Sequence, residues 1–281
     1  MTEREVAEFI DAQFRAHGCE GPSFTTIVSF GANAADPHHE PDDTVLKEGD
    51  CVLFDMGCVK SRYCSDMTRT WFCGQPTEKQ AAVHDLVRRA NEAAEALIKP
   101  GVRLCELDAA ARDLITEAGY GAYFNHRLGH FIGQTDHEKG DVSSANTAVA
   151  RPGMIFSIEP GVYLPGEFGV RVEDLVLVTE TGCEVLNRND KRLGWWVGPV
   201  KHSGRGRTCP ARGLPSALCH GKAAGAYRMR PYGLRFRQRE KTPRGASPHK
   251  KRRGGFHIRP CPFAARQTSA GAYRMRPYGV I

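Results

Sequence analysis

The sequence predicts an α+β domain in which helices pack on the outside of an antiparallel sheet. Segments with the periodicity of amphipathic helices occur in blocks, and strand-type runs lie before and after the longest block, which is typical of this class. Residues 1–193 also differ in composition from the rest of the chain. A segment of that length is long enough to bury one sizeable core.

The chain divides near Leu193 into two parts of opposite charge. Residues 1–193 contain 19 Lys and Arg and 31 Asp and Glu, a formal net charge of −12. Residues 194–281 contain 20 Lys and Arg and one acid, Glu240, so the net charge of +7 for the whole chain describes neither part. We therefore predict a folded domain over 1–193 and a basic tail over 194–281.

Three segments have the apolar spacing of amphipathic helices: 2–16, 77–99 and 104–118. Thr2 suits the N-cap of the first helix, with Glu5 three residues on as its capping-box partner. Thr77 and Gln80 repeat this arrangement at the start of the second helix. Gly or Pro follows each segment, which is where helices usually end.

Six apolar runs are typical of strands: 24–30, 51–56, 68–72, 154–158, 162–164 and 170–179. The runs 51–56 and 68–72 predict a hairpin with a long connection, because Gly57 ends the run 51–56 and β-type residues resume at Thr68. Pro-Gly pairs bound the short run at 162–164 on both sides. These strands supply the predicted antiparallel sheet.

Nothing in the sequence predicts secretion or a membrane span. Residues 1–14 are polar and acidic, without the basic segment and apolar core of a signal peptide. No apolar run approaches the ~18 residues that a membrane span needs. The ten cysteines include no C-x-x-C pair, which argues against a zinc ribbon, and we interpret them as reduced thiols of a cytoplasmic protein.

The basic tail contains the sequence AGAYRMRPYG twice, at 224–233 and 270–279. Two copies are too few for a solenoid, which needs about three units to bury a core. Gly, Pro and Arg dominate and aliphatic residues are scarce, so we predict that the tail is disordered and not part of the fold. One interpretation is a basic arm that binds nucleic acid. The other, which we favour because nothing in the acidic part calls for a polyanion, is sequence appended by read-through or a frameshift.

Five side chains in the acidic part have the chemistry of a metal site, although each alone would also fit a turn or loop: Asp55, Asp66, His130, Glu159 and Glu173. Asp55 ends an apolar run and Glu173 lies inside another, where an unpaired charge is costly. Asp66 lies across the predicted hairpin from Asp55, so both carboxylates could reach one point. Four acids and one imidazole suit Mn²⁺, Co²⁺, Fe²⁺ or Zn²⁺. Four carboxylates carry too much charge for one divalent ion, which indicates two.

Three histidines flank this set in the sequence. As neutral imidazoles, His38, His126 and His137 could donate hydrogen bonds to charge that develops at a metal-bound oxygen. His39, next in the chain, competes with His38 for that role. The other two could equally be hydrogen-bonded loop residues.

Four stretches carry a family resemblance: DPHHEP, VLFDMGCVKSRYCSDMTRTW, HRLGHFIGQTDHE and GMIFSIEPGVYLPGEFGVRVEDLVLVTETG. They resemble the pita-bread metallopeptidases, which include methionine aminopeptidase, Xaa-Pro aminopeptidase and prolidase. Together they span Ser23 to about Leu186. The ligand order Asp-Asp-His-Glu-Glu, with Asp66 eleven positions after Asp55, is highly specific. The resemblance therefore implies the pita-bread fold.

Within this family, the sequence is more similar to the Xaa-Pro branch than to methionine aminopeptidases. This similarity is carried by SDMTRTW, followed by a helix, and by IEPGVYLPGEFGVRVED. The histidine-rich stretch departs from the pattern of the branch at Gln134 and Asp136, where an aliphatic residue is usual. These two departures concern the choice of substrate rather than metal binding.

The resemblance implies a role for each of the five residues. Asp55 would chelate one metal ion, and Asp66 and Glu173 would bridge both. His130 and Glu159 would complete the coordination of the second ion. A hydroxide held between two ions, Mn²⁺ first with Co²⁺, Zn²⁺ or Fe²⁺ as alternatives, would be the nucleophile. Glu159 would receive its proton.

The resemblance also implies roles around the metal ions. His38 and His137 would stabilise the tetrahedral intermediate or bind the substrate, and His126 and Arg171 would position the peptide. Strand alternation places Arg171 on the same face as Glu173. The implied activity is hydrolysis of the Xaa-Pro bond by an aminopeptidase or dipeptidase.

The resemblance fades after about Arg192. Relatives of the Xaa-Pro branch usually carry a separate N-terminal domain, and their catalytic domain typically begins one helix earlier. We therefore expect 1–193 to be a truncated catalytic domain without its first helix, with a peptide as substrate and a homodimer as one assembly. The alternatives are a methionine aminopeptidase-like hydrolase, a pita-bread hydrolase of another substrate, and a non-catalytic binding protein, although such proteins generally lose metal ligands.

Overall fold

A computed structural model describes residues 1–196 of the chain. The prediction of a disordered basic tail concerns 197–281 for the most part and lies outside the described residues. The helices of the described part are α1 Glu3–Ala16, α2 Glu78–Leu97 and α3 Leu104–Glu117, with short 3₁₀ helices η1 Gly31–Ala35 and η2 Gly121–Tyr123. Both predicted capping boxes are present, at Thr2 and at Thr77.

The strands of the described part form four sheets. A four-stranded sheet has the order β14-β6-β3-β2, with the bounds Trp195–Trp196, Thr68–Cys73, Cys51–Asp55 and Ile27–Phe30. A five-stranded sheet has the order β13-β12-β9-β7-β8, with the bounds Cys183–Val185, Asp174–Val178, Ile155–Ile158, Gly129–Phe131 and Glu138–Val142. The smaller sheets pair β10 Gly161–Leu164 with β11 Phe168–Arg171, and join β1 Gly21–Pro22, β4 Cys58–Lys60 and β5 Tyr63–Cys64.

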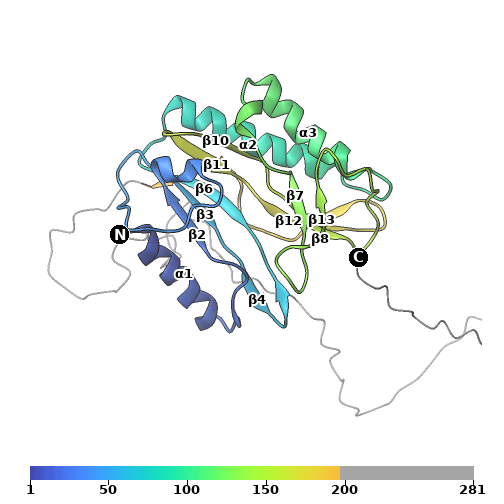
Figure 1. The fold of residues 1–281 in the computed structure, drawn as a ribbon, viewed down its shortest axis with the longest axis horizontal. Coiled ribbons are helices and arrows are strands. Elements are labelled where there is room, and N and C mark those ends of the chain that lie inside the picture. Colours follow the sequence, from blue (N-terminus) through green and yellow to red (C-terminus); the bar gives the residue numbers. More distant parts are fainter. Residues whose placement is uncertain (197–281) are drawn as a thin grey trace, which may run out of the picture. The chain divides into compact units, whose positions relative to one another are not determined.

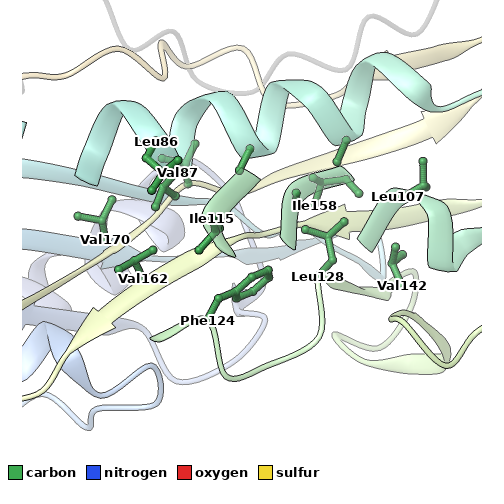
Figure 2. Close-up of a cluster of buried hydrophobic side chains, with 14 of the residues drawn as sticks. Leu86, Val87, Leu107, Ile115, Phe124, Leu128, Val142, Ile158, Val162 and Val170 are labelled. Carbon is green, nitrogen blue, oxygen red and sulfur yellow. The ribbon is translucent and has the colours of Figure 1, made fainter. Parts of the chain in front are cut away.

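Helices cover the sheets from two sides (Figure 1). α2 and α3 pack on each other and lie on one side, where they contact β9, β10, β11 and β8, whereas α1 lies on the other side against β2. The main core lies between α2, α3 and the strands beneath them, with side chains such as Leu86, Ile115, Ile158 and Val170 facing one another (Figure 2). The α+β class predicted from the sequence is confirmed, and the arrangement is the pita-bread fold.

The predicted hairpin of 51–56 and 68–72 is confirmed as the antiparallel pair β3–β6, in which Asp55 lies opposite Thr68. Its long connection contains β4 and β5, which the sequence did not predict as strands because each has only two or three residues. Between Phe24 and Phe30, only Ile27–Phe30 is a strand. The last described strand, β14, pairs in parallel with β6 and extends the paired residues to Trp196, beyond the boundary expected at Leu193.

The prediction of one continuous strand over 170–179 is wrong. β11 ends at Arg171 and pairs with β10, whereas β12 begins at Asp174 and pairs with β9 in another sheet. The chain passes from one sheet to the other at Val172 and Glu173. Hydrophobic alternation does not reveal this break, because the residues of both strands are almost all buried and form one apolar run.

Three strands of the five-stranded sheet were not predicted from the sequence: β7, β8 and β13. β8 reads EKGDV and is mostly exposed, so it lacks the alternation of a half-buried strand. Among the described residues, no helix is both long and apolar enough to cross a membrane.

Candidate metal centre

Acids and a histidine in or next to β6, β7, β9 and β12 meet in one cluster. Ligand atoms of Asp66, His130 and Glu173 lie within 4.8 Å of one another, and all three residues are buried. Glu159 Oε1 is 3.7 Å from His130 Nε2, an atom that is also 3.4 Å from Asp66 Oδ2. Burial raises the pKa of Asp66 and Glu173, and the charge of nearby Asp55 adds to both shifts. The structure thus brings together Asp66, His130, Glu159 and Glu173, and Asp55 lies close enough for its charge to act on them.

The hairpin β3–β6 positions the two aspartates. Asp55 ends β3 and lies on the same side as the core residues two and four positions earlier, because side chains alternate along a strand. Asp66 comes two residues before Thr68, the register partner of Asp55. The connection between them packs closely at Gly57, where a Cβ atom would lie 1.9 Å from the carbonyl oxygen of Ser65. A side chain at this position would push the two aspartates apart.

Glu173 lies where the chain passes from β11 in one sheet to β12 in another. Its backbone N–H donates to the carbonyl oxygen of Thr68 over 3.1 Å, which ties the passage to β6. On the far side, the buried guanidinium of Arg69 donates to the Glu173 carbonyl oxygen over 2.6 Å and to Asp174 Oδ1 over 2.7 Å. The backbone of Glu173 is therefore fixed from both sides, and its carboxylate faces the cluster.

His130 and Glu159 come from neighbouring strands, β7 and the end of β9. The Glu159 N–H donates to the Leu128 carbonyl oxygen over 2.8 Å, and Ser157 Oγ accepts from the His130 N–H over 2.9 Å. Ser157 Oγ in turn donates to Glu159 Oε1 over 3.2 Å. Gly129 permits this closeness, because a Cβ atom there would lie 1.9 Å from the Ser157 carbonyl oxygen. One serine thus orients both predicted ligands.

Burial sets the protonation of this cluster. It raises the pKa of Asp66 and Glu173 well above the usual range and that of Glu159 to about 7, and it lowers the pKa of His130 to about 4. His130 Nδ1 lies 3.2 Å from the carbonyl oxygen of its neighbour, so a neutral ring presents a free Nε2 to the acids. Within residues 1–196, buried Asp55 Oδ1 and Asp66 Oδ1 accept no hydrogen bond. Unpaired carboxylate oxygens beside a free imidazole nitrogen fit divalent cations.

Arg171 is a buried cation at the edge of the cluster. Its NH2 group donates to Asp55 Oδ2 over 2.6 Å, and its Nε atom donates to Thr68 Oγ1 over 3.0 Å. Its NH1 group donates to the Tyr163 hydroxyl over 2.9 Å and to the Pro37 carbonyl oxygen over 3.2 Å. Through its bond to Oδ2, Arg171 orients Asp55. Its predicted contact with a peptide stays a prediction.

His126 is connected to this arginine through Tyr163. His126 Nε2 is 2.9 Å from the Tyr163 hydroxyl, and its Nδ1 is 2.7 Å from the carbonyl oxygen of Arg127. Burial, reinforced by the charge of Arg171, lowers the pKa of His126 to about 3, so the ring is neutral at pH 7. We therefore assign the proton to Nδ1, and the tyrosine hydroxyl donates to Nε2 while it accepts from Arg171.

The structure separates the two histidines that competed for one role. His38 is exposed. Burial of His126 and His137 is the largest cause of their lowered pKa values, and the charge of His38 is a smaller cause for each, which places His38 near both. His39 faces the other way, with Nε2 2.6 Å from Glu3 Oε2. His38 is therefore the histidine of this pair on the side of the metal cluster.

His137 and Asp136 lie beside the imidazole of the cluster. The rings of His130 and His137 have centroids 3.9 Å apart, and His137 Nδ1 lies 3.2 Å from the NH2 group of Arg127. Asp136 Oδ1 is buried and has no hydrogen-bond partner within the described residues. Burial raises the pKa of Asp136 to about 6, with a contribution from Asp55. This departure from the family pattern thus adds a further acid close to the predicted ligands.

Three residues that orient predicted site residues were not predicted from the sequence: Thr68 and Ser157, which bind metal ligands, and Tyr163, which binds His126 and Arg171. Thr68 lies in a family-like stretch, but its role depends on a partner 105 positions away. Tyr163 sits in an apolar strand and resembles an ordinary core residue. Gln134, the other departure, is exposed, and its backbone N–H donates to Glu138 Oε1.

Comparison with known proteins assigns the family. Residues 1–180 match metallopeptidase family M24, and the chain belongs to this family. An uncharacterized peptidase of Staphylococcus saprophyticus is 49% identical over 191 residues, which are 68% of this chain and 55% of that protein. An uncharacterized peptidase of Staphylococcus aureus is 47% identical over 191 residues, 68% of this chain and 54% of that protein. The chain thus spans about half the length of these relatives.

Solved structures share the fold at substantial identity. Prolidase from Pyrococcus furiosus superposes with a TM-score of 0.67 at 41% identity, over 68% of this chain and 56% of that one. X-Pro aminopeptidase from Thermotoga maritima has a TM-score of 0.68 at 39% identity, over 70% of this chain and 56% of that one. Xaa-Pro dipeptidase from Bacillus anthracis has a TM-score of 0.69 at 39% identity, over 70% of this chain and 55% of that one. The chain therefore has the fold and the core of a metallopeptidase.

Proposed function

We propose that this chain hydrolyses the Xaa-Pro peptide bond as an exopeptidase and uses two divalent metal ions, with Mn²⁺ as our first choice. The observation that carries the proposal is the convergence of Asp66, His130 and Glu173, with Glu159 Oε1 3.7 Å from His130 Nε2. Asp55 Oδ1 and Asp66 Oδ1 are buried and unpaired among the described residues. Four carboxylates match the charge of two divalent ions.

The ions would be held by the set Asp55, Asp66, His130, Glu159 and Glu173. When bound, such ions polarise a carbonyl group and lower the pKa of water toward neutrality. Glu159 would take up a proton at its carboxylate and return it during turnover. Ser157 Oγ, which donates to Glu159 Oε1, keeps that carboxylate oriented.

The surrounding residues would bind and orient the peptide. His38 and His137 are exposed, so their imidazoles can reach a substrate and donate hydrogen bonds to negative charge on its carbonyl oxygen. The neutral His126 and the Tyr163 hydroxyl form a fixed wall, because each is hydrogen-bonded to the other and Tyr163 is bonded to Arg171. A fixed wall lowers the entropy cost of positioning the peptide.

The choice of the Xaa-Pro bond rests on likeness rather than on a contact in the site. Structures named prolidase, X-Pro aminopeptidase and Xaa-Pro dipeptidase are 39–41% identical to this chain over 68–70% of its length. Asp136, where relatives of this branch usually have an aliphatic residue, is the residue of this chain most suited to alter that preference.

Peptide hydrolysis by the full chain tests the proposal. The purified protein, loaded with Mn²⁺ or Co²⁺, is given Xaa-Pro peptides and Met-Ala peptides, and the released amino acids are measured. Cleavage of Xaa-Pro peptides is expected. Preferential release of methionine from Met-Ala peptides would instead assign a methionine aminopeptidase-like activity.

Metal content per chain tests the site independently of substrate. Wild-type protein is expected to retain two ions after gel filtration, and Glu173→Gln is expected to retain fewer, because the buried carboxylate next to Thr68 is lost. Glu167→Gln, which changes an exposed acid paired with Lys79, is the matched control. Equal metal content in all three proteins would contradict the assigned site. The cytoplasmic location and the homodimer stay predictions.

A further inference from the structure

Glu3 is an acid of the first turn of α1 and is completely buried. Its Oε1 atom accepts from the Phe30 N–H over 2.7 Å and from Asn33 Nδ2 over 3.0 Å. Its Oε2 atom accepts from His39 Nε2 over 2.6 Å and from the Asp42 N–H over 3.1 Å. Four donors therefore converge on one carboxylate, and three of them belong to the segment from Asn33 to Asp42.

This arrangement is a hydrogen-bonded clamp and not a second metal site. Glu3, His39 and Asp42 do lie close enough together to bind an ion. However, both Glu3 oxygens already accept two hydrogen bonds each, and Asp42 Oδ1 accepts from the Thr44 N–H over 2.7 Å. The metal cluster differs in this respect, because it contains buried carboxylate oxygens without partners among the described residues.

The clamp restrains the loop that carries His38. On one side of His38, the Pro37 carbonyl oxygen accepts from Arg171 NH1, whose guanidinium also binds Asp55. On the other side, His39 binds Glu3. Within residues 1–196 the imidazole of His38 has no hydrogen bond of its own. Its position therefore depends on hydrogen bonds of the His38 backbone, of Pro37 and of His39.

We propose that Glu3 is a positioning residue for hydrolysis: through His39 and the amide of Asp42 it fixes the loop 36–44 so that His38 faces the metal cluster. The inference rests on the proposed function, because it assigns Glu3 an effect on catalysis through His38. A displaced His38 would donate poorly to charge on the substrate, since hydrogen bonds of this kind depend on an oriented donor.

A double-mutant cycle between positions 38 and 39 tests the inference on the full chain. His39→Ala removes one donor of the clamp and leaves the other three, so the fold is expected to persist. We expect it to lower kcat by roughly 10- to 100-fold, with little change in KM and none in metal content per chain. In a His38→Ala background the same substitution is expected to have almost no further effect, because the residue through which it acts is gone.

Conservative and distant changes serve as controls. His39→Gln keeps a side-chain N–H donor and is expected to restore part of the kcat lost in His39→Ala. Glu8→Gln changes an exposed acid of the same helix and is expected to leave kcat unchanged. If His39→Ala leaves kcat unchanged, or lowers it by the same factor with and without His38, the positioning role is wrong.

Hydrogen exchange separates this inference from the proposed function. Glu3→Gln, in which an amide NH₂ replaces an oxygen that accepts two donors, is expected to speed exchange of the amides in 36–44, whereas Glu8→Gln is not. Unchanged exchange in Glu3→Gln overturns the clamp, whatever the enzyme cleaves. A wild-type chain that binds metal but cleaves no Xaa-Pro peptide overturns the proposed function, and the role of Glu3 in that reaction with it.

Discussion

The Thr68 hydroxyl donates a hydrogen bond to Glu173 Oε2 over 2.6 Å, and so joins the two large sheets at the metal cluster. Its oxygen also accepts from Arg171 Nε over 3.0 Å. Arg171 in turn binds Asp55. One buried hydroxyl group thus sets the orientation of one predicted ligand directly and of another through an arginine.

Thr68→Val removes this hydroxyl group and keeps the shape of the side chain. Loss of a partner that orients a ligand typically lowers metal affinity by about 10- to 100-fold, and we expect a loss in that range. Titration calorimetry with Mn²⁺ measures it. Thr68→Ser, which keeps the hydroxyl group, is the control. An unchanged affinity in the valine variant would mean that the Glu173 carboxylate does not depend on the Thr68 hydroxyl group.

Gly129→Ala is expected to disrupt the contact between β7 and β9. A Cβ atom at Gly129 would lie 1.9 Å from the Ser157 carbonyl oxygen, so one strand must move. We expect a loss of about 1–3 kcal/mol in the free energy of unfolding, measured with urea, and a lower metal content because His130 shifts with its neighbour. Gly182→Ala, where nothing lies within 4 Å of the added atom, should change neither quantity.

His84 on α2 makes stability depend on pH. Burial lowers its pKa from 6.5 to about 4, so between these values the unfolded chain binds a proton that the folded chain does not. Its contribution to stability is complete above pH 6.5 and is lost as the pH falls toward 4. In His84→Leu, the fall in the free energy of unfolding over this window should be less steep by up to about 1.4 kcal/mol per pH unit.

Urea denaturation at a series of pH values measures this slope. The readout is the difference in slope, not in absolute stability, because leucine also changes the packing against Phe72. His17→Gln, at an exposed position after α1, is the comparison protein. Equal slopes for His84→Leu and wild type would contradict a neutral, buried His84.

Asp136→Val restores the aliphatic residue that is usual in the Xaa-Pro branch. Burial raises the pKa of Asp136 from 3.8 to about 6, so the folded metal-free chain keeps a proton that the unfolded chain releases, and stability falls as the pH rises through this window. With EDTA at pH 7.5, the variant should be more stable by roughly 1–3 kcal/mol, the usual cost of a buried unsatisfied group. The gain should disappear below about pH 4. An equal gain at both pH values would point to packing instead of charge.

Local features were read correctly from the sequence where short-range chemistry decides them. Thr2 and Thr77 begin helices because their hydroxyl groups cap the next turn, and both capping boxes are present. The hairpin of β3 and β6 followed from two apolar runs and a glycine. The break at Glu173 was missed, because the choice of a new partner strand is made by another part of the chain.

The sequence by itself determined which groups are available: four acids and an imidazole at the ends of buried runs, with a spacing typical of the M24 family. Only the tertiary structure decided how they are supported. It placed Thr68 under Glu173, turned His39 toward Glu3 and left His38 on the side of the cluster. These relationships join residues far apart in the chain, and their energies depend on burial and on distances of a few ångströms, which no local pattern of residues records.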